Sequence, residues 1–332
     1  MALNPQDRLR ELMQVRGIGE KTAQQLLDAG VDSLERLITV KPEELSAILK
    51  VSLAKAKAIQ AAAKDLALSR VITLMTGEQY RRRLEETVRY IPTGIEPLDE
   101  FLGGGFPTSA LVAVSGSSSS GKTELGYSLC VNCVGVLGRP FAFIETEPST
   151  FSLARLLEIA ESRGVKIDLA GDMFIVQASD IASSPDKLYL AYETVLKRFE
   201  EEERKPGVLV VDSFSAPFRQ TFIGRETLSL RSQEIARHIG LLQVLASRFN
   251  MLVYLTEQVY GVPDFSAQLK AVARFGDSRV PYGGEALLHM VSWHLTVVRL
   301  ASDRFMIITD DVVGRPVREF EFKITERGVQ AA

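Results

Sequence analysis

The chain has 332 residues, of which 46% are hydrophobic and 24% are charged, and its formal net charge at pH 7 is −3. These values indicate a globular protein of two or three domains with a sizeable core, and they exclude an intrinsically disordered chain. A slightly acidic molecule has no overall attraction for nucleic acid or anionic membranes, so any nucleic-acid site has to be local.

Two further classes of protein are disfavoured. No apolar run approaches the roughly 20 residues that span a bilayer, and no apolar signal region follows Met1, so we expect a cytosolic or nuclear protein without a membrane partner. The only two cysteines, Cys130 and Cys133, form a CxxC pair in an apolar helical pattern with no second ligand pair. This setting favours buried structural thiols over a zinc or redox site.

Residues 1–68 predict a compact module of short helices, because apolar residues recur at helical spacing and no strand pattern appears. The stretch "VRGIGEKTAQQLLDAG" has the form of a helix-hairpin-helix. In it Gly17 and Gly19 make the tight turn, and Lys21 with nearby backbone N–H groups is suited to contact a DNA phosphate. We interpret the second half, residues 34–66, as packing support.

Residues 69–86 read "SRVITLMTGEQYRRRLEE", which predicts a short β-rich tract followed by a basic run, and we interpret this segment as a connector between domains. From residue 87 to 332, buried strand-like runs alternate with helical segments. Such alternation predicts an α/β domain whose mostly parallel sheet is covered by helices on both faces. The last runs, "VSWHLTVVRL", "DRFMIITDD" and "REFEFKIT", predict an antiparallel extension of that sheet.

The serine run in "GSSSSGKTELGY" raises the choice between a flexible spacer and a phosphate-binding loop. A strand pattern precedes it and a helical pattern follows it, and the residues fit GxxxxGK[ST], the Walker A motif. In such a loop the backbone N–H groups hold the phosphates, the lysine reaches the β- and γ-phosphates, and the hydroxyl binds Mg²⁺. The predicted site for ATP and Mg²⁺ comprises Gly116, Ser117, Ser118, Ser119, Ser120, Gly121, Lys122 and Thr123.

Polar residues at the ends of other predicted strands complete this site. "GVLVVDS" ends in Asp212, as expected of the second metal-binding acid of such an enzyme. "PFAFIETE" ends in Glu147, which we expect to activate the attacking water, with Glu145 as the alternative. "VYLTEQV" places Gln258 just past a strand, where its amide is suited to sense the γ-phosphate, although a surface amide is the competing interpretation.

The order of these motifs resembles the RecA/RadA recombinase family, in its archaeal and eukaryotic branch, over almost the whole chain. "IPTGIEPLDEFLGGGFPTSALVAVSG" resembles that family's entry into its ATPase core, and "FIETEPSTFSLARL" resembles the segment with its catalytic glutamate, Glu147 here. The resemblance implies a RecA-type P-loop ATPase core behind a helix-hairpin-helix domain. It further implies nucleotide contacts from Glu124, Arg155, a sensor histidine at His289, and Asp311 and Pro316 in a cap over a neighbour's ATP.

The resemblance also locates the basic patches. "DSFSAPFRQTFIGRETLSLRSQEIARH" is similar to the family's first DNA-binding loop, and the stretch up to "PYGGEALLH" is similar to its second. The arginines and lysines expected to bind backbone phosphates of single-stranded DNA are Arg219, Arg225, Arg231, Lys270, Arg274 and Arg279. Phe222 and Phe265 are candidates for stacking on bases. In the connector, Leu74 and Gly77 stand where the family docks an aromatic residue into the next subunit.

The family implies a DNA-dependent ATPase that binds single- and double-stranded DNA, assembles into a filament or ring, and promotes homologous pairing and strand exchange. Its location would be cytoplasmic with the nucleoid in a prokaryote and nuclear in a eukaryote. Several positions depart from the family pattern, among them Glu257 for an asparagine, Ser152 for an arginine, and leucine at 74. A second reading is therefore a recombinase paralogue with a regulatory or mediator role, acting with other recombinase-family proteins. A third is a RecA-like signalling ATPase.

Overall fold

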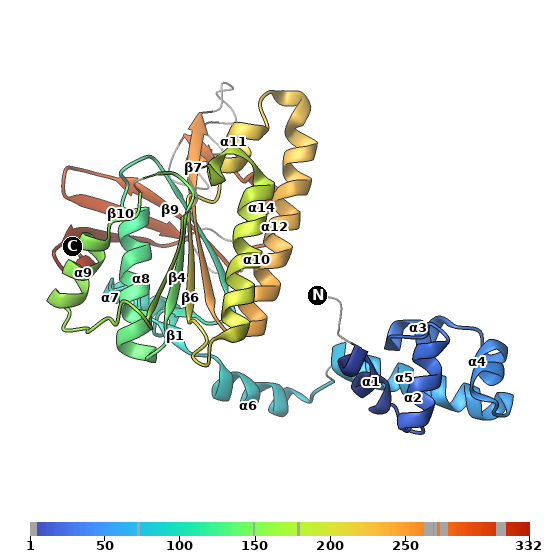
Figure 1. The fold of residues 1–332 in the computed structure, drawn as a ribbon. Coiled ribbons are helices and arrows are strands. Elements are labelled where there is room, and N and C mark those ends of the chain that lie inside the picture. Colours follow the sequence, from blue (N-terminus) through green and yellow to red (C-terminus); the bar gives the residue numbers. More distant parts are fainter. Residues whose placement is uncertain are drawn as a thin grey trace. The chain divides into compact units, whose positions relative to one another are not determined.

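A computed structural model describes residues 5–71, 74–148, 150–177, 180–261, 268, 271–272, 278–309 and 317–332. The chain forms two compact units, Met1–Arg83 and Leu84–Ala332 (Figure 1). No helix that the structure describes is both long and apolar enough to cross a membrane.

The first unit is built from short helices around one apolar core. The helices are α1 (Pro5–Met13), α2 (Glu20–Asp28), α3 (Leu34–Thr39), α4 (Pro42–Leu49), α5 (Leu53–Val71) and the start of α6 (Gly77–Thr87). Leu12, Leu26, Leu37 and Leu45 have no exposed surface in this core. The helical spacing of the apolar residues thus buries one face of each helix.

The connector differs from the prediction, because no strand occurs among its described residues. Helix α5 runs on to Val71 and α6 begins at Gly77. The start of α6 is a capping box: Thr76 Oγ1 accepts a hydrogen bond from Gln79 N at 3.2 Å, and Gln79 Oε1 accepts one from Thr76 N at 2.9 Å. Local capping and the pairing of Glu78 with Arg81 and Arg82 favour a helix over the β-propensity of the preceding residues.

The second unit contains a large sheet with the strand order β12-β11-β10-β9-β3-β7-β6-β4-β5. Its strands are β3 (Leu111–Gly116), β4 (Phe141–Glu145), β5 (Met173–Gln177), β6 (Val208–Asp212), β7 (Leu252–Gly261), β9 (Trp293–Arg299), β10 (Arg304–Thr309), β11 (Glu319–Thr325) and β12 (Gly328–Ala331). Pairing is parallel from β9 through β3, β7, β6 and β4 to β5, and antiparallel from β9 to β12. The predicted parallel sheet with an antiparallel extension is confirmed.

Shorter elements complete the unit. Strand β8 (Arg279–Pro281) pairs with β7, and β1 (Tyr90–Ile91) pairs with β2 (Phe106–Pro107). The helices are α7 (Glu96–Leu102), α8 (Lys122–Leu137), α9 (Leu153–Ser162), α10 (Pro185–Glu201), α11 (Ala216–Thr221), α12 (Leu228–Phe249) and α14 (Gly284–Leu288), with short 3₁₀ turns at Ile181–Ser183 and Arg225–Thr227.

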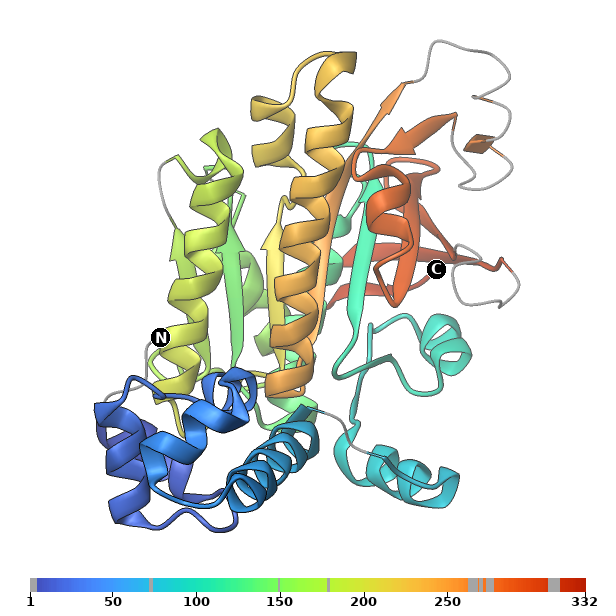
Figure 2. The same cartoon turned by 90° about the vertical axis from the view of Figure 1, so that its right-hand side faces the viewer.

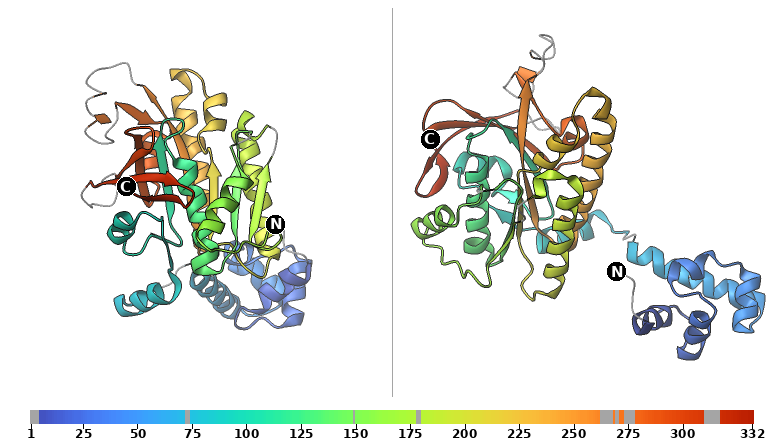
Figure 3. Two further views of the ribbon diagram at one scale, coloured as in Figure 1. Left: turned by 90° about the vertical axis from the view of Figure 1, so that its left-hand side faces the viewer. Right: turned by 45° about the horizontal axis from the view of Figure 1, so that its top comes forward.

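Alternation along the strands divides the interior into two cores. On one face Val112, Val114, Val210 and Tyr254 pack with α8 and α9. On the other face Leu111, Ala113 and the alternate residues of the neighbouring strands pack with α10, α11 and α12. Figure 2 views the side with α10 and α12, and the left panel of Figure 3 views the side with α8 and α9. Cys130 and Cys133 are buried free thiols of α8, as predicted.

Strand β7 carries a carboxyl group into this interior. The side chain of Glu257 is fully buried, and its Oε1 accepts a hydrogen bond from Gly283 N at 3.0 Å. Its Oε2 has no hydrogen-bond partner among the described residues. Burial raises the pKa of Glu257 from 4.5 to about 8, although the Gly283 hydrogen bond and the charge of Arg231 act in the opposite direction. The neutral acid is therefore the favoured form at neutral pH.

This burial makes the stability of the core depend on pH. A carboxyl group whose pKa is raised in the folded state stabilises it below the unfolded pKa, and this contribution is lost as pH rises through the folded pKa. We therefore expect the wild-type free energy of unfolding to fall, relative to that of Glu257→Gln, between about pH 5 and about pH 8, by up to about 1.4 kcal/mol per unit of pKa difference. Urea unfolding followed by the fluorescence of Trp293 measures this, with the exposed Glu203→Gln as control. Parallel pH curves for the wild type and Glu257→Gln would contradict it.

Candidate functional site

A phosphate-binding loop links β3 to α8. Gly116 ends the strand, and a Cβ there would lie 2.5 Å from Val297 O and 2.6 Å from Ser120 Oγ, so only glycine fits. Gly121 precedes the helix with φ +95°, a left-handed conformation that favours glycine. The serine run is therefore an ordered loop that delivers the chain to the start of α8, where free N–H groups attract anions.

Lys122 places a buried ammonium group inside this loop. Its Nζ donates hydrogen bonds to Gly116 O at 2.9 Å, to Ser117 O at 2.6 Å and to Ser120 Oγ at 3.4 Å. Burial lowers the pKa of Lys122 to about 8; Asp212 and Glu147 oppose this shift, and Arg279 adds to it. The protein compensates the charge only in part, so an anionic ligand at the loop would stabilise the protonated amine.

Oxygen ligands suitable for a hard cation lie beside the lysine. Thr123 Oγ1 donates to Asp212 Oδ2 at 2.7 Å, and Thr256 Oγ1 donates to Asp212 Oδ1. Among the described residues no group of three or more His, Cys, Asp or Glu side chains is placed to hold a metal. One hydroxyl and one carboxylate suit Mg²⁺, which binds through few protein oxygens and takes the rest from phosphates and water.

Two glutamates at the carboxyl end of β4 have different environments. Glu145 is buried, and its carboxylate accepts hydrogen bonds from Phe151 N at 3.0 Å and from Gln177 Nε2. It therefore fixes the loop that follows the strand. Glu147 is partly exposed, and its charge acts on Lys122. Of the two predicted candidates, Glu147 is the one whose carboxylate the backbone leaves free.

Arg219 connects Glu147 to Gln258. Its Nη2 lies 3.1 Å from Glu147 Oε1, and its Nη1 donates to Gln258 Oε1. The sequence predicts Arg219 as a DNA-loop residue, but the structure places its guanidinium against the candidate catalytic acid and the candidate sensor. The reason is that α11 begins only four residues after β6 ends and so keeps Arg219 close to the strand ends.

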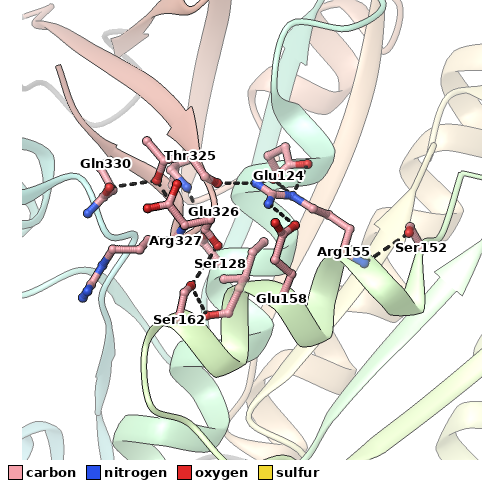
Figure 4. A network of polar contacts seen from close by, with 12 residues as sticks. Glu124, Ser128, Ser152, Arg155, Glu158, Ser162, Thr325, Glu326, Arg327 and Gln330 are labelled. Carbon is pink, nitrogen blue, oxygen red and sulfur yellow. Dashed lines mark hydrogen bonds and ion pairs between the residues drawn. The ribbon is translucent and has the colours of Figure 1, made fainter.

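Arg155, the expected adenine contact, lies in a polar network between α8, α9 and β11 (Figure 4). Its Nε donates to both carboxylate oxygens of Glu124 at 3.1 Å, its Nη1 donates to Glu158 Oε2 at 2.6 Å, and its Nη2 donates to Thr325 O. Ser152 caps α9 by accepting from Arg155 N. These bonds hold the edge of the guanidinium, whereas stacking on a base uses its face.

The other predicted site residues are more scattered. His289 is the C-cap of α14, with its side chain 76% exposed and its Nε2 3.2 Å from Glu285 Oε2. Arg231 lies on α12 with its guanidinium 4.4 Å from the ring centre of Tyr282. Arg279 lies on β8. Lys270, Arg274, Phe265, Asp311, Pro316 and the side chain of Arg225 lie outside the described residues.

Two further residues of β7 build the site, and no sequence motif had indicated them. Tyr254 Oη donates to Lys122 O at 2.7 Å, and Thr256 bonds Asp212 as described above. Both lie on the same face as Gln258, because side chains alternate along a strand. The signal that would have found them is this spacing of two residues, counted back from Gln258.

The hairpin of the first unit has the predicted form. Gly17 has φ +95°, Gly19 precedes α2 without a side-chain cap, and Lys21 is exposed on the first turn of α2. Because Gly19 has no side chain, it offers no side-chain acceptor to the N–H groups at the start of α2.

Comparisons with known proteins agree with this architecture. A model described as a SAM-like helix-hairpin-helix tandem matches residues 9–65, so residues 34–66, which we interpreted as packing support, belong largely to the tandem. The DNA repair and recombination protein RadA of Cenarchaeum symbiosum (strain A) is 32% identical over an alignment of 329 residues that covers 96% of this chain and 79% of that protein. The model of the Rad51 family matches residues 83–332. Because this match covers most of the chain and includes the loop with Lys122, the protein belongs to the Rad51 family.

Proposed function

We propose that this protein is a DNA-dependent ATPase that assembles on single-stranded DNA and promotes homologous pairing and strand exchange in recombinational repair. The observation that carries the proposal is the loop Gly116–Thr123, where a buried lysine lies near two acids, Asp212 at the end of β6 and Glu147 just after the neighbouring β4. Membership of the Rad51 family and the similarity to a RadA protein support the role in recombination.

The chain's own residues divide the work of ATP hydrolysis. Glu147 accepts a proton from water as the water oxygen bonds to the γ-phosphorus, and the bond from that phosphorus to the bridging oxygen breaks to release ADP. Lys122 and the backbone N–H groups of the loop offset the negative charge of the phosphates. A Mg²⁺ ion held by Thr123 and Asp212 would supply further positive charge there. The side-chain amide of Gln258 senses whether the γ-phosphate is present.

Other contacts follow from the family resemblance. Arg155 and Glu124 lie together at the edge of the loop, where the adenine is expected, and His289 is exposed and so accessible to a nucleotide bound by a second copy. Asp311 and Pro316 contact the ATP of a neighbouring copy in the same proposal. Single-stranded DNA is bound by Arg225, Arg231, Lys270, Arg274 and Arg279, and the hairpin with Gly17, Gly19 and Lys21 binds duplex phosphates.

Assembly uses the connector. Leu74 is 96% exposed, and a Cβ at Gly77 would meet nothing within 4 Å, so both are accessible to another copy of the chain. A fully exposed leucine gains free energy when a partner covers it. Leu74 therefore docks on a neighbouring copy and links the subunits of a filament or ring.

Lys122→Ala is expected to abolish ATP hydrolysis while the protein stays folded. The variant removes a positive charge from the phosphates and leaves the loop backbone intact. Phosphate release with and without single-stranded DNA measures the effect, the thermal unfolding midpoint checks the fold, and the exposed Lys166→Ala serves as control. Hydrolysis at the wild-type rate would show that nucleotide chemistry takes place elsewhere.

Glu147→Gln is expected to bind ATP as the wild type does and to hydrolyse it roughly 100-fold more slowly or worse, because it lacks a general base. Fluorescent-nucleotide binding and single-turnover hydrolysis separate the two effects. The exposed Glu161→Gln is the matched control. If turnover were unchanged in Glu147→Gln, another acid would have to activate the water.

Lys21→Ala is expected to weaken duplex DNA binding with little dependence on base sequence, because a phosphate contact carries no sequence information. The slope of log affinity against log salt should fall by about 0.9 for one lost duplex phosphate. Fluorescence anisotropy over a salt series tests this, with Lys64→Ala on α5 as the control of equal charge. Equal slopes for the wild type and Lys21→Ala would remove Lys21 from the DNA interface.

A further inference from the structure

One guanidinium binds both side chains that are expected to act at the γ-phosphate. Arg219 on α11 donates from Nη2 to the carboxylate of Glu147, which follows β4, and from Nη1 to the amide oxygen of Gln258 on β7. The hydrogen bonds join residues 72 and 39 positions apart in the chain. An oxygen lone pair that accepts from Arg219 is not free to accept from water at the same time.

An anion is able to displace Glu147 and Gln258 from the guanidinium of Arg219. The ion pair is partly exposed, with 33% of the Arg219 side chain and 31% of the Glu147 side chain accessible, and such pairs are weak. Arg219 Nε is buried and has no hydrogen-bond partner among the described residues, so the donors of this group are incompletely satisfied. A phosphate oxygen accepts from a guanidinium more strongly than a neutral amide does.

A chain of contacts connects this guanidinium to a second arginine on α12. Tyr282 Oη shares its one hydrogen between Phe218 O at 3.2 Å and Phe222 O at 3.3 Å, which fixes the end of α11. The ring of Tyr282 also contacts Arg231, whose guanidinium lies 4.4 Å from the ring centre. A polyanion that contacts Arg231 therefore acts on the same helix that carries Arg219.

We propose that Arg219 is a latch on the ATP site. Without DNA it holds Glu147 and Gln258 together and away from catalysis, and a phosphodiester of DNA at α11 draws the guanidinium off and frees both. This inference rests on the proposed function, because it assigns Arg219 as the positioning residue through which DNA stimulates hydrolysis. Arg219 itself takes no part in proton transfer.

The test compares Arg219→Ala and Arg219→Lys with the wild type. Both variants lose the bridge, because a lysine offers a single point charge instead of a fork. Hydrolysis without DNA should rise roughly twofold to fivefold, the range that a partly exposed ion pair allows, and the ratio of DNA-stimulated to basal rate should fall toward one. Arg237→Ala, which removes a cation of α12 that pairs with Asp186 and Glu234, should leave both rates unchanged.

Two further measurements separate a latch from a merely structural role. In a Glu147→Gln background, Arg219→Ala should no longer raise basal turnover, because the general base that the latch would free is absent. Single-stranded DNA should tighten the binding of a non-hydrolysable ATP analogue to the wild type, and this coupling should disappear in Arg219→Ala.

The outcomes are distinct. A fall of the basal and stimulated rates by one common factor in Arg219→Ala, or an unchanged ratio of the two, would overturn the latch while leaving the ATPase in place. A wild type that hydrolyses no ATP would refute the proposed function. In that case the loss of DNA-to-nucleotide coupling in Arg219→Ala would still support the latch, and unchanged coupling would refute it.

Discussion

The register of the central parallel strands is the constraint on which the candidate site depends. In this register Gly116 of β3 stands opposite Gln258 of β7, and Glu145 of β4 stands opposite Asp212 of β6. Parallel strands run in one direction, so the segments that leave their carboxyl ends meet at one edge of the sheet. Asp212 thereby bonds Thr123 and Thr256, which lie 89 and 44 positions away in the chain. A slip of one residue in β7 would turn Thr256 and Gln258 to the opposite face.

Cations at the two edges of the sheet illustrate the difference between a structural and a functional charge. Arg139, just before β4, donates to the carbonyl groups of four residues, Lys205, Pro206, Phe249 and Asn250, and so ties together the segments that enter β6 and β7. The N–H donors of Arg139 thus bond to backbone carbonyl groups. Lys122 bonds the carbonyl groups of its own loop, and burial depresses its pKa. Burial lowers the pKa of Arg139 as well, but Lys122 lies in the loop at the start of α8, where a bound phosphate would stabilise its charge.

Three glutamates near the strand ends show how surroundings assign different roles to one residue type. Glu145 is buried and accepts backbone and amide hydrogen bonds, Glu257 is buried with a raised pKa, and Glu147 is partly exposed beside a cation. Desolvation favours the neutral acid at Glu257, whereas Glu147 is partly exposed and lies beside the guanidinium of Arg219. The acid expected to meet water is therefore the one that the fold leaves accessible.

Local patterns in the sequence determined the elements and the loop chemistry. Apolar runs between helical segments predicted the strands, glycine spacing with Lys122 predicted the phosphate loop, and the GxG in the first unit predicted the hairpin. These features need only neighbouring residues. The helix α6 escaped prediction because its capping box outweighs the β-propensity before it. Tertiary structure alone decided that Arg219 bonds Glu147 and Gln258, that Thr256 supports Asp212, and that Arg155 pairs with Glu124, because each contact joins segments whose proximity depends on strand order and helix packing rather than on spacing along the chain.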